Sequence, residues 1–239
     1  MKIIKLHSWK VTPKQAIAIQ HKLRDKIKTF DDFDSLKTIA GVDVGFIKEK
    51  NLSCAALVIF SYPDMRILDV KTCSEPINFP YIPTLLAFRE VPVVLSCFEN
   101  LENPPDILIL DGQGYAHPRR MGLACHVGVL LDIPTIGCAK SRLTGEFNMP
   151  DEKKGSYSYL YDKEEIIGAV LRTKDDTYPV FVSIGHKVSL DTAIKLVLEM
   201  AVTRIPEPTK IADREVKKYA NKIRDMKLEQ ESFFKNYGI

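Results

Sequence analysis

Apolar and polar residues alternate along the first half of this chain in a way that predicts a mixed α/β fold. Three extended, apolar-rich segments are expected over about 37–47, 53–62 and 66–75. The connectors between them, at 48–51 and 62–65, are short and turn-like, which favours an antiparallel meander. A helix is then predicted to begin at Pro92, followed by a strand at 107–110, a helix near 119–131 and a strand at 134–139.

The two ends of the chain are predicted to be helical. Thr12 and Gln15 form a capping box with proline at the first helical position, so a first helix should cover about 13–28. After a tyrosine-rich meander or loop over about 155–175, a strand is expected at 178–184 and a helix capped by Ser189. A last amphipathic helix should cover about 213–230. We expect both terminal helices to be additions to a single domain spanning residues 1–239.

The predicted order of elements from residue 37 is β-β-β-α-β-α-β. This order is that of the α/β, ribonuclease-H-like plan, a mixed sheet of three antiparallel strands followed by βαβ units, with helices flanking it. In that plan the first strand lies beside the strand that follows the first helix. Side chains at 43 and 111 would then come from neighbouring strands.

Two acidic residues stand at unusual places in these strands. Asp111 directly follows the aliphatic run 107–110, and Asp43 interrupts the apolar segment 38–46. A buried carboxylate without a partner is costly, so two of them from adjacent strands suggest a shared cation. Carboxylate oxygens favour a hard divalent ion of the magnesium kind.

Composition narrows the class of protein only slightly. The chain has 239 residues, 45% hydrophobic, and a net charge of +3. From Arg204 onward there are nine Lys/Arg and six Asp/Glu, so the predicted C-terminal helix is mildly basic, which suits either phosphate contacts or a solvated helix face. The five cysteines show no CxxC pairing, no apolar stretch is long enough for a membrane span, and residues 1–10 lack a signal-peptide core. We therefore expect a cytoplasmic protein without a membrane partner.

Several sequence motifs of this chain resemble those of the endonuclease V family, the deoxyinosine-directed endonucleases. The most specific is the stretch from Asp111-Gly-Gln-Gly-Tyr-Ala-His-Pro-Arg119 to Gly122-Leu-Ala-Cys-His126. The other matches are Gly41-Val-Asp-Val44, Pro80-Tyr-Ile-Pro83, Phe88-Arg-Glu90, Gly137-Cys-Ala-Lys140, Gly185-His186 and Pro206-Glu-Pro-Thr209 with Asp213. Together they run from about residue 38 to 213.

The resemblance implies a DNA-repair enzyme that uses Mg²⁺, with Mn²⁺ as a substitute. It would cleave the second phosphodiester bond 3′ to deoxyinosine and leave 3′-OH and 5′-phosphate ends. Asp43 and Asp111 would be the metal carboxylates, and Glu90 and Asp213 the other two catalytic acids. From the residues alone, capping of a helix N-terminus is a competing role for Glu90 and for Asp213.

Six residues are candidates for nucleic-acid binding, three of them by the same resemblance and three by their position directly after Asp111. Tyr81, stiffened by the prolines at 80 and 83, matches the family's strand-separating wedge, although a lone tyrosine more often packs on its own domain. The turn Gly112-Gln113-Gly114 would offer backbone groups to a flipped-out base, whereas a lone Gly-x-Gly is usually only a turn. His117 matches a nucleic-acid contact, and Lys140 matches a phosphate-facing lysine whose alternative is a surface lysine.

Three other functions fit parts of the pattern. The same chemistry could act on inosine in RNA, since a 2′-hydroxyl contact is not visible in a sequence. A non-catalytic nucleic-acid-binding module of the same fold is disfavoured, because a degenerate copy need not keep Asp43, Glu90 and Asp111 together. A ribonuclease-H-like hydrolase without base selectivity would not need the Tyr81 wedge. We expect a monomer.

Overall fold

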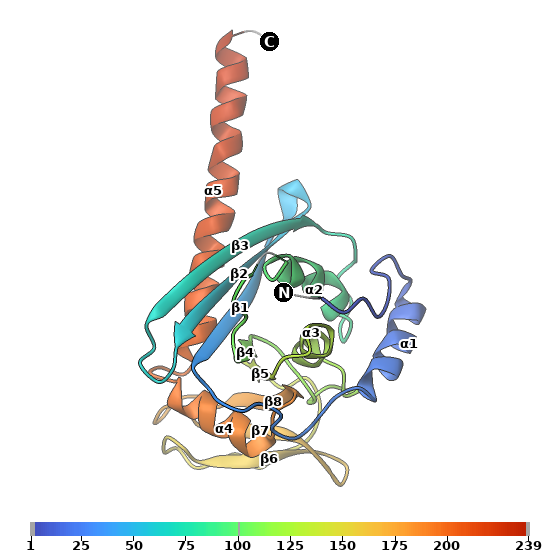
Figure 1. The fold of residues 1–239 in the computed structure, drawn as a ribbon, viewed down its shortest axis with the longest axis vertical. Coiled ribbons are helices and arrows are strands. Elements are labelled where there is room, and N and C mark those ends of the chain that lie inside the picture. Colours follow the sequence, from blue (N-terminus) through green and yellow to red (C-terminus); the bar gives the residue numbers. More distant parts are fainter. Residues whose placement is uncertain (1–2, 100, 238–239) are drawn as a thin grey trace.

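One mixed β-sheet with helices on both faces organises the chain (Figure 1). The computed structural model describes residues 3–99 and 101–237. The eight strands lie in the order β3-β2-β1-β4-β5-β8-β7-β6. This arrangement confirms the α/β, ribonuclease-H-like sheet predicted from the order of elements.

The strands fall into an antiparallel meander, a parallel centre and a second antiparallel group. β1 (Thr38–Ile47), β2 (Leu52–Ser61) and β3 (Ile67–Pro76) form the meander. β1 then pairs in parallel with β4 (Ile107–Leu110), and β4 pairs in parallel with β5 (Thr135–Ala139). The remaining strands are antiparallel to their neighbours: β8 (Val180–His186), β7 (Glu165–Leu171) and β6 (Tyr157–Asp162).

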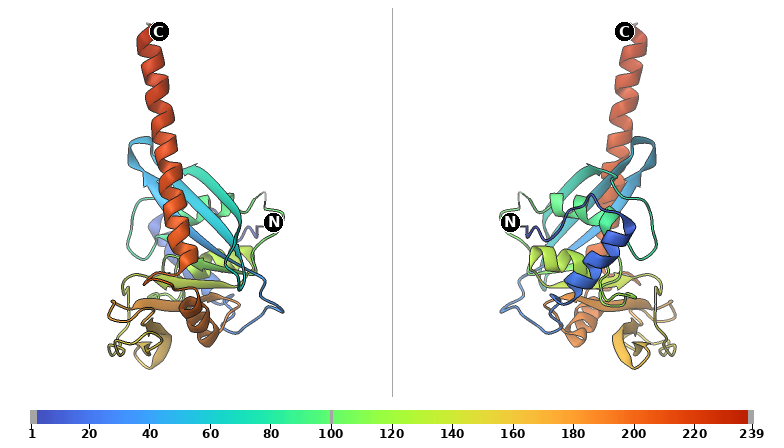
Figure 2. Two further views of the ribbon diagram at one scale, coloured as in Figure 1. Left: turned by 90° about the vertical axis from the view of Figure 1, so that its left-hand side faces the viewer. Right: turned by 90° about the vertical axis from the view of Figure 1, so that its right-hand side faces the viewer.

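The helices divide between the two faces of the sheet. α1 (Pro13–Arg24), α2 (Ala87–Ser96) and α3 (Leu123–Leu131) lie on one side, and α4 (Leu190–Glu199) and α5 (Glu207–Tyr237) on the other. A single 3₁₀ turn, η1 (Lys48–Lys50), joins β1 to β2. In both side views α5 continues well past the edge of the sheet (Figure 2). Within the described residues no helix is long and apolar enough to cross a lipid bilayer.

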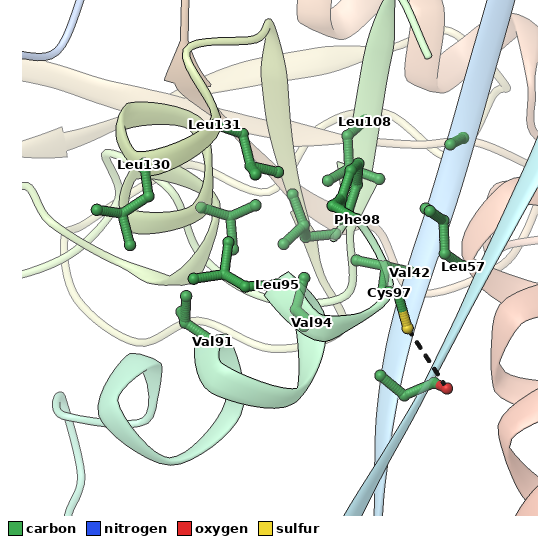
Figure 3. Packing of buried hydrophobic residues seen from close by; sticks show 14 of the residues in the cluster. Val42, Leu57, Val91, Val94, Leu95, Cys97, Phe98, Leu108, Leu130 and Leu131 are labelled. Atoms are coloured by element: carbon green, nitrogen blue, oxygen red, sulfur yellow. Dashed lines mark hydrogen bonds between the residues drawn. The ribbon is translucent and has the colours of Figure 1, made fainter. Parts of the chain in front are cut away.

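The alternation of β1 and β4 side chains builds a separate core on each face. Val42, Leu57 and Leu108 pack against Val94 and Phe98 and the other α2 and α3 residues drawn in Figure 3. The alternate residues, among them Ile39, Ile107 and Ile109, pack with α4 on the opposite face. All of these side chains are almost completely buried, so the central strands are fixed from both sides.

The start of α5 lies directly on β1 at a glycine. A Cβ on Gly41 would fall 2.1 Å from the backbone of Pro208, so no larger residue fits without moving the helix. Further along the same face, Gly45 lies under Val216. This close approach brings α5 next to the strand that carries Asp43.

Two predicted helix starts are wrong. α2 begins at Ala87 and contains Pro92, five residues after its first residue. Proline favours a helix start, but here it lies in the second turn, where it costs a backbone hydrogen bond that packing of α2 against the sheet offsets. α3 begins at Leu123, after Gly122 as N-cap, because residues 111–122 form a loop of turns and bends that is not helical.

Other boundaries differ less. The capping box of α1 is present as predicted, but the helix ends at Arg24, before the predicted residue 28. The tyrosine-rich segment forms the β6–β7 hairpin. Ser189 caps α4 as expected, its hydroxyl accepting from the Thr192 N–H at 3.2 Å, and the helix ends at Glu199. α5 begins at Glu207 and is longer than predicted.

Candidate active site

Asp43, in the middle of β1, and Asp111, directly after β4, lie where the parallel pairing of these two strands ends. The last paired residues of β1 and β4 are Val42 and Leu110, and each is followed by its aspartate. The predicted adjacency of the two acids is therefore present in the sheet. Side chains alternate between the two faces of a sheet along each strand. Gly41, two residues before Asp43, is covered by the start of α5, so both aspartates belong to the face on which α5 lies.

Glu90 and Asp213 reach the same strand ends from two helices. Glu90 is in the first turn of α2 and is 8% exposed. Asp213 is in the second turn of α5, where Lys217 contacts it at 2.6 Å. The four acids predicted to be catalytic thus come from β1, α2, the end of β4 and α5.

The charges of these carboxyls act on one another. Burial, together with the charges of Asp111 and Asp213, raises the pKa of Asp43 to about 7. Burial and the charges of Asp43 and Asp111 raise the pKa of Glu90 to about 8. Like charges gathered in a partly desolvated site destabilise each other unless a cation is present.

Lys140 is the cation that the chain itself supplies. Its ammonium, at the end of β5, forms an ion pair with the Asp111 carboxylate. Burial alone would lower its pKa, but the hydrogen bond to Asp111 and the charges of Asp43 and Asp213 raise it. The Lys140 carbonyl accepts a hydrogen bond from Arg204 at 2.7 Å, which holds the backbone of this lysine in place.

The donor set fits a hard divalent cation. All four acids are linked by electrostatic coupling, all of their donors are carboxylate oxygens, and Glu90 and Asp43 have pKa values that an added positive charge would lower. Among the side chains that the structure describes, those of residues 3–99 and 101–225, no three His, Cys, Asp or Glu already stand in coordinating positions. Closer approach of these carboxylates would be needed for them to share an ion.

A pocket of about 400 Å³ opens beside Asp111 and Lys140. One wall is the loop before α2, with Tyr81 to Thr84, and the floor includes Gly112 and Gln113. Tyr81 is 70% exposed at the tip of its loop. The remaining lining residues are mainly apolar or small: Leu86, Ala87, Met121, Gly122, Leu123, Ala139, Ser141 and Leu143, with Gln20, His117 and Arg142.

Most of the residues predicted to bind nucleic acid meet at this pocket. Tyr81, Gly112, Gln113, His117 and Lys140 all line it. Gly114 does not line the pocket, because it packs against the backbone of β8 at Ile184. A Cβ there would fall 2.1 Å from the Ile184 carbonyl oxygen. Its N–H donates to the Ser183 hydroxyl at 2.9 Å, and its carbonyl accepts from the Gly122 N–H at 3.0 Å.

His117 is buried and has a protein partner at each ring nitrogen. Nδ1 accepts from the Arg119 N–H at 3.1 Å, which leaves the proton on Nε2 to be donated to the Thr84 carbonyl at 2.9 Å. Burial lowers the pKa of His117 to about 4, so the ring is neutral at pH 7. The hydrogen bond to the Thr84 carbonyl therefore connects the His117 ring to the Tyr81 loop.

Several pocket residues escaped the sequence analysis. Gln20 comes from α1, and Arg142 and Leu143 follow Lys140 at the pocket's edge. Arg204 acts through backbone carbonyls 25 to 64 residues away. No local sequence motif predicts such long-range contacts. For Arg142 and Leu143, the available sequence signal is their position just after Lys140.

An acidic site at the central strand ends of a ribonuclease-H-like sheet, next to a base-sized pocket, defines a nuclease. The sequence model of the family described as Endonuclease V matches residues 21–214. The chain therefore belongs to the endonuclease V family and is an enzyme that hydrolyses phosphodiester bonds.

Relatives and solved structures agree with this assignment. Endonuclease V of Trichormus variabilis is 47% identical over 216 residues, covering 90% of this chain and 98% of the relative. The structure of Endonuclease V from Streptomyces avermitilis has a TM-score of 0.87 at 36% identity, covering 94% of this chain and 100% of that one. Endonuclease V of Ciona intestinalis, solved with a 24mer DNA containing an inosine followed by a ribo-adenosine, has a TM-score of 0.77 at 34% identity, covering 89% of this chain and 100% of that one.

Proposed function

We propose that this enzyme recognises deoxyinosine in DNA and cleaves the second phosphodiester bond on its 3′ side, leaving 3′-OH and 5′-phosphate ends. The observation that carries the proposal is the pocket between the Tyr81 loop and the Gly112–Gln113 turn, which opens directly beside Asp111 and Lys140. The inosine-containing DNA bound by the Ciona relative supports the same substrate class. Repair of deaminated adenine is the process this activity would serve.

The pocket is suited to a base taken out of its stack. Its volume of about 400 Å³ is within the range of small-molecule sites, and its walls are mostly apolar. Hypoxanthine offers a carbonyl and a ring N–H to the backbone of Gly112 and Gln113, whereas adenine offers the reverse pattern. Buried donors or acceptors left unpaired by adenine cost about 1–3 kcal/mol each.

Leu123 limits the room on the other side of the base. Its Cδ2 lies 3.2 Å from where a Cβ on Gly112 would be, so the glycine leaves only a shallow space next to it. Guanine shares the hydrogen-bonding edge of hypoxanthine but carries an additional amine. A closely fitted wall of this kind excludes guanine by size.

For the chemical step we assign Asp43 and Asp111 as metal ligands and Glu90 and Asp213 as supporting acids, with Mg²⁺ as the metal and Mn²⁺ as a substitute. A bound Mg²⁺ supplies charge neutralisation at the phosphate and a water of lowered pKa. Lys140, already beside Asp111, places a positive charge where a phosphate would enter. Tyr81 is proposed to separate the base from its neighbours.

The direct test compares matched oligonucleotides containing deoxyinosine in DNA or inosine in RNA, in Mg²⁺, Mn²⁺ and chelator, with the products mapped at nucleotide resolution. We expect cleavage of deoxyinosine DNA one nucleotide beyond the bond next to the lesion, and none in chelator. Equal cleavage of adenine, guanine and inosine substrates would contradict the base pocket.

A second candidate substrate is inosine in RNA. The nucleic acid bound by the Ciona relative carries a ribo-adenosine after its inosine. A ribose at that position carries a 2′-hydroxyl beside the phosphate of the bond that we propose is cleaved, the second one 3′ to the inosine. Cleavage of inosine RNA at a rate well above that of deoxyinosine DNA would make this the principal activity.

A further inference from the structure

The loop that presents Tyr81 ends in an unusual backbone conformation. Thr84 has φ +68°, a left-handed value that residues with a branched Cβ rarely adopt. Thr84 lines the pocket near the end of this loop, two residues after Ile82 and three before the start of α2 at Ala87. Its torsion therefore sets the direction in which the preceding residues leave the body of the protein.

The carbonyl of Thr84 accepts hydrogen bonds from three side chains. Gln20 Nε2 donates at 3.0 Å, His117 Nε2 at 2.9 Å and Arg119 Nη2 at 2.9 Å. Arg119 also donates to the Thr84 hydroxyl. A carbonyl oxygen has two lone pairs, so three donors on one oxygen represent an unusual concentration of contacts on a single peptide group.

Gln20 links the members of this group. It is fully buried, although it belongs to a helix whose other polar side chains are mostly exposed. Its Oε1 accepts from Arg119 Nε at 2.6 Å, and its amide also donates to the Met121 carbonyl at 3.0 Å. Gln20 thus contacts the loop, the arginine and the residue before Gly122, and it lines the pocket.

Besides this polar group, apolar packing fixes the two ends of the loop and Ile82, while Tyr81 at the tip is exposed. Phe79 and Leu85, at its two ends, are buried in an apolar cluster with Phe88. Between them Tyr81 is 70% exposed, and the tip is stiffened mainly by Pro80 and Pro83. The prolines restrict their own torsions but not that of Thr84.

We propose that Gln20 is a positioning residue that, through the Thr84 carbonyl and Arg119, holds the Tyr81 loop in the conformation required to part a base from a duplex. The inference rests on the proposed function and extends it to a residue of α1 that lies outside the part of the chain matched by the family, residues 21–214. If Gln20 holds the Tyr81 loop, its loss should affect duplex substrates more than single-stranded ones. Inosine in a duplex needs a rigid wedge, whereas inosine in a single strand does not.

The test uses Gln20→Met, which keeps the length of the side chain and removes all three hydrogen bonds. Two variants on the same helix serve as controls. Leu23→Ala removes a buried apolar contact to Met121 and Cys125 without touching the polar group, and Lys22→Met changes an exposed residue. Cleavage of inosine is measured in duplex and in single-stranded oligonucleotides of the same sequence, with kcat and KM separated.

Gln20→Met should lower kcat/KM on the duplex by about tenfold, mainly through KM, and lower it on the single strand by a clearly smaller factor. Leu23→Ala should reduce both substrates equally, in proportion to its loss of stability, and Lys22→Met should match the wild type. Arg119→Lys, which keeps the charge but loses the planar fork, should reproduce the duplex-specific loss and serves if Gln20→Met does not fold.

Amide hydrogen exchange of Tyr81, Ile82, Thr84 and Leu85 gives a readout that does not depend on activity. Exchange there should accelerate in Gln20→Met and Arg119→Lys but not in Lys22→Met. Equal losses on duplex and single strand, or unchanged exchange in the loop, would overturn the role of Gln20. If the wild type fails to cleave inosine at all, the proposed function is wrong, and the exchange experiment still decides whether Gln20 orders the loop.

Discussion

The ammonium of Lys140 is paired with the carboxylate of Asp111 across the adjacent ends of β4 and β5. The lysine lines the pocket and is about half exposed, so it can exchange this contact for a phosphate without leaving a buried charge behind. The pair therefore links the position of the base pocket to that of the acidic cluster.

Replacing Lys140 by alanine should lower turnover and reduce the salt dependence of DNA binding by about one phosphate contact. Binding is measured at a series of salt concentrations and the slope compared with that of the wild type. Lys195→Ala, a change of an exposed lysine on α4, is the matched control. An unchanged slope with wild-type turnover would show that Lys140 is only a surface lysine.

Asp43→Ala and Asp111→Ala should each abolish cleavage while the protein stays folded. Each change removes a proposed metal ligand and relieves repulsion among the remaining acids. In metal-free buffer we therefore expect thermal stability to be maintained or slightly increased. Retained cleavage in either variant would remove that residue from the catalytic set.

The stability of the metal-free enzyme should fall as pH rises from about 4.5 to 8. The pKa of Glu90 is raised from 4.5 to about 8 and that of Asp43 from 3.8 to about 7, so the folded state binds more protons in this window. The contribution is fully present below the unfolded pKa values and is lost as pH rises through the folded ones, at up to about 1.4 kcal/mol per pH unit for each group.

Chemical denaturation at pH 5, 6, 7 and 8 measures this slope. Glu90→Gln cannot ionise at this position and should flatten the curve, and added Mg²⁺ should restore stability at pH 8 in the wild type. An equally steep curve in Glu90→Gln would mean that the ionisation of Glu90 is not the cause.

Tyr81→Ala should weaken the enzyme on inosine in a duplex more than on inosine in a single strand. The ring stacks only where a base has to be separated from its neighbours, and loss of stacking costs about 1–3 kcal/mol per base. Cleavage of both substrates by Tyr81→Ala and by Tyr157→Ala, an exposed tyrosine on β6, separates the effect from a general surface change. An equal loss on both substrates would assign the tyrosine another role.

Valine at Gly112 and valine at Gly114 should have different consequences. At Gly112 the new side chain meets Leu123 at the pocket wall, so inosine cleavage should be lost while the fold and the binding of metal persist. At Gly114 it collides with the Ile184 backbone, so the protein should lose stability. Thermal unfolding and cleavage distinguish the two, and a stable, active Gly112→Val would contradict the proposed position of the base.

The parts of this site that could be predicted from sequence are those determined by contiguous residues. The aliphatic run 107–110 predicts a buried strand, and the acid after it needs no long-range information. The capping box at Thr12 is likewise local, and it is present. Pro92 shows the limit of local signals, because packing of α2 against the sheet overrides the preference of proline for a helix start.

The support of the pocket could not be predicted in this way. Gln20 meets Thr84 over 64 residues and Arg119 over 99 residues, and each of these residue types alone is ordinary on a surface. The left-handed torsion of Thr84 has no sequence signal, since a β-branched residue argues against it. Such contacts become visible only once the fold has brought the segments together.

The packing of α5 on the sheet also determines how short this enzyme can be made. α5 is held on the sheet by the contact of Pro208 with Gly41 and, further on, by Val216 and Ala220 in a cluster with Ile47 and Cys54. A protein ending at residue 214, where the family match stops, would keep Asp213 and the contacts of Ala212 but lose those of Val216 and Ala220. The minimal active fragment is therefore set by the packing of α5 and should extend at least to Ala220, beyond its last acidic site residue.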